Sequence, residues 1–338
     1  MYLFRPAQLS DLSDIERLAQ DSGPMVCTLP ATHTHLTQKI ERSLTSFSED
    51  VEAPGDQAYF FVLEDARSGR LMGTGAINAL AGCQEPFYAL RKDVLIHSSR
   101  ALNVHSRIQA LTLNHDLSDH SQLCSFYVDP SLRDTPYAAL VTLGRLLFMS
   151  AFPMRFSDQW LAVMPGVADA EGRAPFWEHV GRKFFGMDYN QVEYYNGTRD
   201  KTFIAELMPH HPLYVPLLAK EAQQALGQVH GDAQLQFSLL NDEGFEADKY
   251  VEIFDAGAIM TARRDTLSIW HGKQHACVAG ATDGLATAKP FLIGFMRPDG
   301  FCATIVPAHF AGKKLILEQG KCEEAGLQQG QSVWFLPL

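Results

Sequence analysis

The sequence has few cations for its length. Its 338 residues include 28 Lys and Arg against 39 Asp and Glu, which gives a formal charge of −11 at pH 7. Non-specific binding to nucleic acid depends mainly on Lys and Arg at phosphates, so this deficit argues against a nucleic-acid partner. It leaves room for one anionic small molecule held by a local basic cluster.

Long apolar runs are absent as well. No uncharged apolar stretch approaches the about 18 residues that suggest a membrane span. The opening residues, MYLFRPAQLSDLSD, have only a few apolar side chains before Arg5 and Asp11, so we expect no signal peptide. We therefore expect no membrane partner.

The cysteines lack any C-x-x-C pair. This scatter fits reduced thiols in a cytoplasmic protein better than a disulfide framework or a structural zinc site. Three histidine pairs, one of them in HGKQHAC, have no second half with ligand spacing, so we expect no metal. The six cysteines are at positions 27, 83, 124, 277, 302 and 322, and the histidine pairs are 33/35, 210/211 and 271/275.

What remains is an ordinary globular composition, with 46% hydrophobic and 20% charged residues. Residues 1–260 read as strands and helices in an α/β layered domain, with a long insertion near 80–121 that is rich in Ser, His and Asn. Residues 265–338 consist of short β-like runs with turn signals, which predict a small barrel-like β domain.

Several elements can be assigned within these regions. Residues 57–79 predict a hairpin that turns at 65–69, and 136–152 predict a long helix with Pro136 at its first position. Residues 175–188 predict a helix that ends at Gly181 and passes into a Phe-rich strand. SIWHG is interpreted as a β-like run, and KCEEAGLQQGQSVWFLPL as closing strands of the barrel.

The stretch FYVDPSLRDTPYAAL, residues 126–140, has the order of a phosphate-binding element: a strand, a short loop with one arginine, and a helix start. Such loops usually contain glycine, because only glycine lets the backbone approach an anion closely. Here the loop after Arg133 has no glycine, and Pro136 has no N–H to donate.

Several stretches together resemble one family. LFRPAQLSDLSDIERLA, FVLEDARSGRLMGTGAI, FYVDPSLR and PFWEHVGRKFFGMD have the order of a GNAT-type N-acyltransferase domain. FVLED, EPFY, GRLLFM, FIAELMP, GQVH and EGF…IFD resemble, more narrowly, the arginine N-succinyltransferase family. The resemblance spans essentially the whole chain and is strongest to the alpha-chain branch, in which the same loop is poor in glycine.

The resemblance implies an α/β GNAT-type acyl-CoA N-acyltransferase fold with a small C-terminal β-barrel-like domain. It implies transfer of succinyl from succinyl-CoA to the α-amino group of L-arginine, with L-ornithine as an alternative acceptor, in arginine catabolism. No permanently bound cofactor is expected. It further implies an oligomer, with a paralogous beta subunit as one candidate partner.

The resemblance also carries site residues over. Phe126, Tyr127 and Val128 lie at the strand that pairs with the pantetheine arm, and Phe126 matches the family's succinyl-CoA contact. Arg133 and the helix start after it would hold the pyrophosphate, and the missing glycines predict fewer backbone contacts. The GQVH match places His230 at the family's proton-donor position.

The 80–121 insertion is used near the acceptor pocket in the family, which makes Glu85 and Asn103 candidate acceptor contacts. A solvated loop is the equally good alternative for both residues. Direct attack on the thioester is favoured, because no Ser or Cys lies in a nucleophile motif with a base.

Two other functions stay open at this point. The loop without glycines favours a weakly active or regulatory subunit that binds arginine and needs a beta chain. An acetyl-CoA-dependent GNAT enzyme acting on another amine would leave the GQVH and EPFY motifs unexplained.

Overall fold

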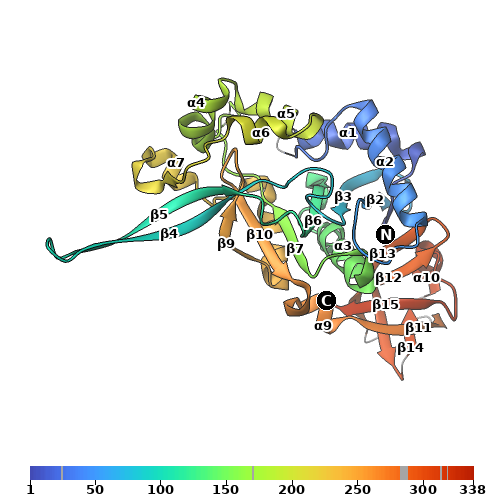
Figure 1. Cartoon of the computed structure of the whole chain (residues 1–338). Helices are drawn as coiled ribbons and strands as arrows, with labels where there is room; N and C mark the ends of the chain where they lie inside the picture. Colours follow the sequence, from blue (N-terminus) through green and yellow to red (C-terminus); the bar gives the residue numbers. More distant parts are fainter. Residues whose placement is uncertain (24–25, 170, 282–287, 313, 318) are drawn as a thin grey trace.

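The computed structural model describes residues 1–23, 26–169, 171–281, 288–312, 314–317 and 319–338 (Figure 1). The strands are β1 (Tyr2–Pro6), β2 (Ala58–Asp65), β3 (Leu71–Asn78), β4 (Ala89–Ser99), β5 (Val104–Asn114), β6 (Ser121–Val128), β7 (Gln159–Val163), β8 (Leu213–Tyr214), β9 (Glu246–Val251), β10 (Ala258–Arg263), β11 (Gln274–Ala281), β12 (Lys289–Arg297), β13 (Gly300–Ala311), β14 (Lys314–Leu317) and β15 (Ser332–Pro337). The α-helices are α1 (Leu12–Ser22), α2 (His33–Ser48), α3 (Leu140–Ala151), α4 (Arg182–Phe185), α5 (Tyr189–Thr198), α6 (Thr202–Leu207), α7 (Lys220–Ala225), α8 (Gln234–Glu243), α9 (Ser268–Gly272) and α10 (Gln319–Ala325).

The described strands form one continuous sheet that ends in a closed barrel. Their order is β12-β15-β11-β14-β13-β1-β2-β3-β6-β7-β10-β9-β4-β5-β8, and an added pairing of β12 with β13 closes the first five into the barrel. The barrel joins the sheet where Phe4 of β1 pairs with Ala303 of β13. The predicted mixed α/β fold and the small C-terminal barrel are confirmed, while the domain boundaries at 260 and 265 stay a prediction.

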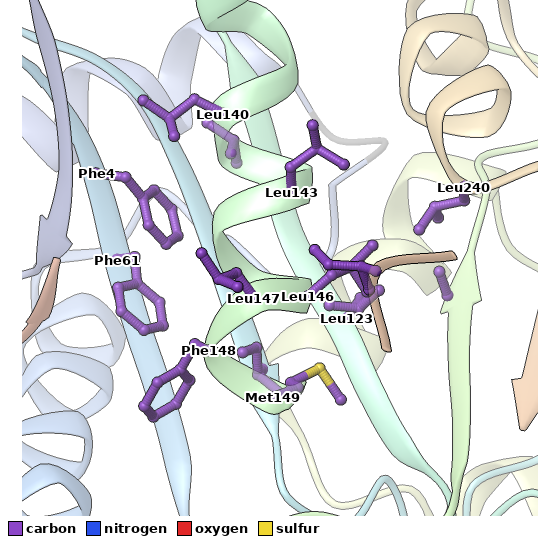
Figure 2. Close-up of a cluster of buried hydrophobic side chains, with 14 of the residues drawn as sticks. Phe4, Phe61, Leu123, Leu140, Leu143, Leu146, Leu147, Phe148, Met149 and Leu240 are labelled. Atoms are coloured by element: carbon purple, nitrogen blue, oxygen red, sulfur yellow. The ribbon is translucent and has the colours of Figure 1, made fainter. Parts of the chain in front are cut away.

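Side chains of β2 point alternately to the two faces of the sheet, and helices cover both faces. Phe60 and Val62 point into a cluster with the buried residues of α1 and α2. Phe61 points to the opposite face, where it meets α3, because successive strand side chains face opposite sides. Figure 2 shows α3 between Phe4 and Phe61 on one side and Leu123 of β6 on the other. Helix α3 therefore fixes β6, the strand from which the site is built.

Gly181 lies inside a helix, so the predicted helix end and Phe-rich strand are wrong. A π-helical turn at Trp177–Gly181 continues as α4, and the chain leaves the helix at Gly186 with φ of 64°. A Cβ on Gly181 would lie 2.1 Å from Cε3 of Trp177. The missing side chain makes room for the indole ring, and the glycine does not mark a helix end.

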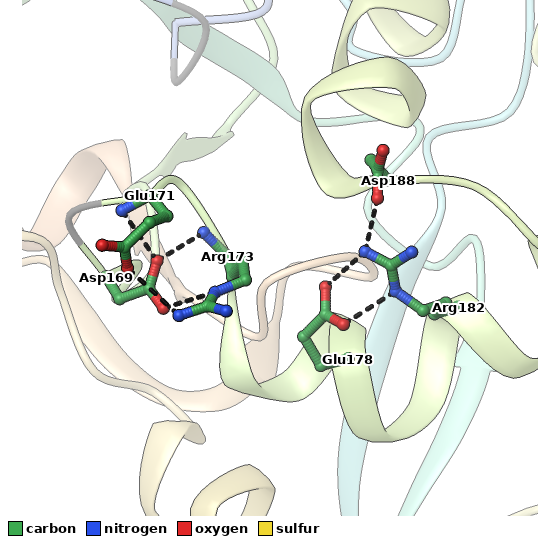
Figure 3. Close-up of polar contacts among 6 residues, drawn as sticks. All are labelled: Asp169, Glu171, Arg173, Glu178, Arg182 and Asp188. Atoms are coloured by element: carbon green, nitrogen blue, oxygen red, sulfur yellow. Dashed lines mark hydrogen bonds and ion pairs between the residues drawn. The ribbon is translucent and has the colours of Figure 1, made fainter.

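Arg182 ties this helix to the start of α5. Its guanidinium donates to the Glu178 carboxylate at 2.7 and 2.8 Å and to Asp188, the residue before α5, at 2.6 Å (Figure 3). A second network of Asp169, Glu171 and Arg173 closes the loop that precedes the helix. Both networks brace the segment that leads into α5.

The long insertion and two segments of the C-terminal region also have defined structures. The 80–121 insertion forms the hairpin of β4 and β5, which projects from the body (Figure 1). SIWHG is the helix α9 and not a strand, and residues 319–325 form α10 before the closing strand β15. None of the described helices is both long and apolar enough to span a membrane.

Candidate active site

Strands β6 and β7 separate after a short parallel pairing. Their register runs from Ser121↔Trp160 to Leu123↔Ala162, while β6 continues to Val128 against β3 on its other side. The β3–β6 register shifts near Ser125, whose φ is 50°. Thr28 fixes this irregular residue, because its hydroxyl accepts from the Ser125 N–H at 2.9 Å. The far half of β6 therefore borders an opening.

A cavity of about 460 Å³ occupies this opening, a volume ordinary for a small-molecule site. It is lined by Leu123 to Val128 of β6, by Val163 at the end of β7 and by Pro165 just after that strand. Arg133 lies at the same cavity as the three β6 residues predicted to bind the CoA, Phe126, Tyr127 and Val128. The structure thus brings the predicted co-substrate residues together.

His230 lies on the segment that borders this cavity. Its main-chain N–H donates to the Pro165 carbonyl at 2.8 Å, and the cavity is lined by Pro165, Asp232 and Ala233. Nδ1 of the ring accepts from the Asp232 N–H at 3.2 Å, which leaves the proton of a neutral ring on Nε2. The Asp232 carboxylate lies 3.6 Å from Nδ1, so it can stabilise a protonated ring.

Arg133 connects the helix start to the His230 segment. Its guanidinium pairs with the Asp232 carboxylate at 2.9 Å, and its side chain is 41% exposed. Several main-chain N–H groups of this loop donate to carbonyls within the loop. The donors are Arg133, Thr135 and Ala138, and the acceptors are, in the same order, Pro130, Leu132 and Thr135. These amides are therefore already occupied, in addition to the donor missing at Pro136.

The two candidate acceptor residues lie in different places. Both Glu85 carboxylate oxygens accept from the Lys201 N–H at 3.3 Å, and Lys201 lines the cavity, so Glu85 lies one contact behind its wall. Asn103 is exposed in the turn between β4 and β5, at the far end of the projecting hairpin (Figure 1). It does not line the cavity, and both roles stay predictions.

A group of carboxylates absent from the sequence-based prediction lines the same cavity. Glu193 comes from α5, and Glu252 and Asp255 from the turn between β9 and β10. Asp255 accepts from the N–H groups of Gly166 and Gly257 at 2.6 and 2.7 Å and from the Tyr189 hydroxyl at 2.9 Å. The inner end of the cavity is therefore strongly acidic.

Burial changes the protonation of this group. Loss of contact with water, together with the Asp255 charge, raises the pKa of Glu193 to about 8. The same two causes raise the pKa of Glu252 well above its usual value. Near neutral pH these carboxyl groups therefore hold a proton.

Cys27 is the thiol closest to this acidic group. Burial, with the Glu193 charge second, raises the pKa of the Cys27 thiol well above its usual value. A thiol held in its protonated form is a poor nucleophile, which agrees with direct attack on the thioester. Within the described ranges no group of three or more His, Cys, Asp and Glu side chains is arranged to hold a metal ion.

The sequence matches a known protein family along most of its length. A family model described as arginine N-succinyltransferase beta subunit matches residues 2–269. Arginine N-succinyltransferase subunit alpha of Pseudomonas aeruginosa is 42% identical over 335 residues, which cover 98% of each chain. Arginine N-succinyltransferase of Yersinia pestis is 35% identical over 344 residues, with 100% of this chain and 98% of the relative covered.

A solved structure gives the same answer for the fold. The structure of arginine/ornithine succinyltransferase subunit AI from Pseudomonas aeruginosa matches with a TM-score of 0.91 at 39% identity, covering 100% of this chain and 98% of the other. These findings define the class of the protein as an acyltransferase. The chain belongs to the arginine N-succinyltransferase family.

Proposed function

We propose that this chain transfers the succinyl group of succinyl-CoA to the α-amino group of L-arginine, giving N2-succinylarginine and CoA in arginine catabolism. Family membership over the full chain supports the reaction. The separation of β6 from β7 is the observation that carries it, because it opens a cavity beside a strand edge. A GNAT-type fold uses that edge to pair with the pantetheine arm.

In this proposal the donor lies along β6. Phe126, Tyr127 and Val128 contact the pantetheine arm, and Arg133 exchanges its Asp232 partner for the pyrophosphate. The helix start at residues 136–140 adds its dipole, worth about 0.3–1 kcal/mol at an exposed site. The self-bonded loop leaves Arg133 as the main polar contact to the phosphates.

His230 carries the proton in this proposal. The attacking amine must lose a proton as the tetrahedral intermediate forms, and the departing thiolate sulfur gains one. To take the first proton, Nδ1 must give up its contact with the Asp232 N–H, and the protonated ring can then deliver its Nε2 proton to the sulfur. Asp232 stabilises the positively charged ring between the two steps.

The protein also works as an oligomer in our proposal. Relatives named as alpha and beta subunits support pairing with a second family member. The hairpin of β4 and β5 supplies a surface for it, because Val94, Ile96, Leu102 and Val104 are between 49% and 75% exposed. Exposed apolar side chains gathered on one projecting element are typical of a protein contact.

An assay of the purified single chain with L-arginine and succinyl-CoA tests the reaction. We expect release of CoA thiol and a product with succinyl on the α-nitrogen, identified by tandem mass spectrometry. Acetyl-CoA serves as the matched donor control and should support much slower turnover. Activity that appears only after a beta subunit is added would favour the regulatory-subunit alternative, for which the glycine-free loop speaks.

A further inference from the structure

The acidic end of the cavity lacks a balancing cation. Glu193 is 5% exposed and Asp255 4% exposed, and Glu252, which also lines the cavity, is half-buried. Buried carboxylates are normally paired, because an unpaired charge away from water is costly. In the described part of the chain, no Lys, Arg or His forms an ion pair with any of these three.

Their hydrogen bonds divide the three residues into two roles. Asp255 is occupied by two main-chain N–H groups and Tyr189, and Glu252 accepts from the N–H groups of Phe254 and Asp255 at 2.5 and 2.8 Å. Glu193 differs from both. The Cys27 thiol and the Asn196 amide lie close enough to Glu193 to lower its pKa as hydrogen-bond donors, but across the described ranges it accepts from no main-chain N–H and pairs with no cation.

Among the described residues, Lys201 is the cation whose charge lowers the pKa of Glu193. It lines the cavity and lowers the pKa of Glu193, but this effect is smaller than those of burial and of the Asp255 charge. One lysine beyond ion-pair distance leaves the three carboxylates in excess. The Asp255 charge gives this part of the cavity a negative potential, and a bound cation would favour the ionised form of Glu193.

Main-chain hydrogen bonds around Pro165 and Gly166 connect the acidic part of the cavity to the His230 segment. Pro165 accepts from the His230 N–H, and the next residue, Gly166, donates to the Asp255 carboxylate. Gly227, which begins the His230 segment, donates to the Ala256 carbonyl at 2.8 Å. A molecule whose amine lies near His230 can therefore extend toward Glu193 within one cavity.

We propose that Glu193 binds the cationic side chain of the acceptor amino acid, with Glu252 and Asp255 supplying further negative potential. The inference deepens the proposed function by naming its acceptor subsite, and it rests on that function. A guanidinium or an ammonium group at this position would donate to the Glu193 oxygens as the carboxyl loses its proton. Acceptor selectivity would then come from charge at the end remote from the reacting amine.

Kinetics with a charged and an uncharged acceptor test this inference. L-Citrulline matches L-arginine in shape but lacks the positive charge. In the wild type we expect kcat/KM for arginine to exceed that for citrulline at least a hundredfold. Glu193→Gln should raise the KM for arginine at least tenfold, change the KM for succinyl-CoA less than twofold, and remove most of the preference over citrulline.

Glu243→Gln is the matched control. Glu243, on α8, is also a buried glutamate whose pKa is raised by burial. It accepts a hydrogen bond from the Ile269 N–H at 2.8 Å and does not line the cavity. We expect it to keep the preference for arginine. The inference is wrong if Glu193→Gln keeps that preference as well, or if it lowers kcat/KM for arginine and for citrulline by the same factor.

Calorimetry gives a second test that needs neither turnover nor a folded variant. Titration of the wild type with arginine or citrulline, with CoA present, measures proton release from its dependence on buffer ionisation enthalpy. Arginine should release more protons than citrulline at pH 7, because the bound cation expels the proton of Glu193. Equal proton release together with equal dissociation constants for the two acceptors would overturn the inference. Failure of succinyl transfer in the wild type would refute the proposed function alone.

Discussion

At the scale of single residues, His230 is the most consequential prediction. A positioned imidazole contributes typically about 10²–10⁴-fold to rate through proton transfer. We expect His230→Ala to lower kcat at pH 7 by a factor in that range and to leave the KM for succinyl-CoA nearly unchanged. The deficit should shrink as pH rises, because more of the acceptor amine is then unprotonated.

Steady-state kinetics across pH 6–9 check this prediction. His309→Ala, on β13 of the barrel, is the control and should be close to the wild type. Near-normal kcat for His230→Ala over the whole range would remove His230 from the mechanism.

Glu193 predicts a pH dependence of stability. Its folded-state pKa of about 8 lies above the ordinary carboxylate value of 4.5, so the folded chain binds more protons than the unfolded chain between these values. The free energy of unfolding therefore falls as pH rises through this window, by at most about 1.4 kcal/mol per pH unit from this group. Glu193→Gln removes that dependence.

Thermal unfolding of the ligand-free proteins at pH 5.5 and 8 checks the sign. We expect the melting temperature of Glu193→Gln to exceed that of the wild type by several degrees at pH 8 and to approach it at pH 5.5. Parallel behaviour of the two proteins would mean that Glu193 is ionised in the folded chain throughout.

Among the residues at the cavity, some could be predicted from the sequence and others could not. Motifs pointed to the strand residues 126–128, Arg133 and His230. The first four line one cavity, and His230 lies on the segment beside it. Glu193, Glu252 and Asp255 were missed because a carboxylate in a sequence shows neither its burial nor its partner. One signal was present: YVEIFDAGAIM places two carboxylates within an otherwise apolar strand-like run, which is costly unless they have a purpose.

At the scale of elements, we expect the glycine-free loop to limit the binding of succinyl-CoA. Pro136→Gly would add one N–H at the helix start, and a hydrogen bond contributes about 0.5–1.5 kcal/mol net. We therefore expect the KM for succinyl-CoA to fall by about two- to tenfold, with kcat little changed. Pro153→Gly, at the start of another single helical turn, is the control and should leave that KM unchanged.

An unchanged KM for succinyl-CoA in Pro136→Gly would mean that the missing donor does not limit binding. The amides of Arg133, Thr135 and Ala138 would then be expected to stay bonded within the loop when CoA binds.

Elements were predicted well where alternation or helical spacing was strong and badly where glycine was interpreted by its usual role. The hairpin at 57–79 and the helix from 136 were found because their apolar patterns are regular. Gly181 was taken for a helix end, but it makes room for Trp177, a contact that only the folded chain reveals. SIWHG is apolar at two positions, too few to separate a helical turn from a strand.

At the scale of the whole molecule, the projecting hairpin predicts assembly. Replacing Ile96 and Leu102 by Ser should reduce the oligomer to monomer, because both are more than 60% exposed in the single chain and would be covered by the partner. Light scattering after size exclusion measures the mass. Leu217→Ser, which removes an 83% exposed leucine elsewhere, is the matched control. An unchanged mass for the hairpin variant would place the contact on another surface.

The central claim is that one cavity between β6 and β7 holds donor and acceptor together. A crystal structure of the chain with CoA and L-arginine tests it most directly. We predict the pantetheine arm along Phe126 to Val128, the pyrophosphate within hydrogen-bond distance of Arg133, the arginine side chain at Glu193 and its α-amine near His230. CoA bound away from β6, or a pyrophosphate farther than one side-chain length from Arg133, would contradict the account.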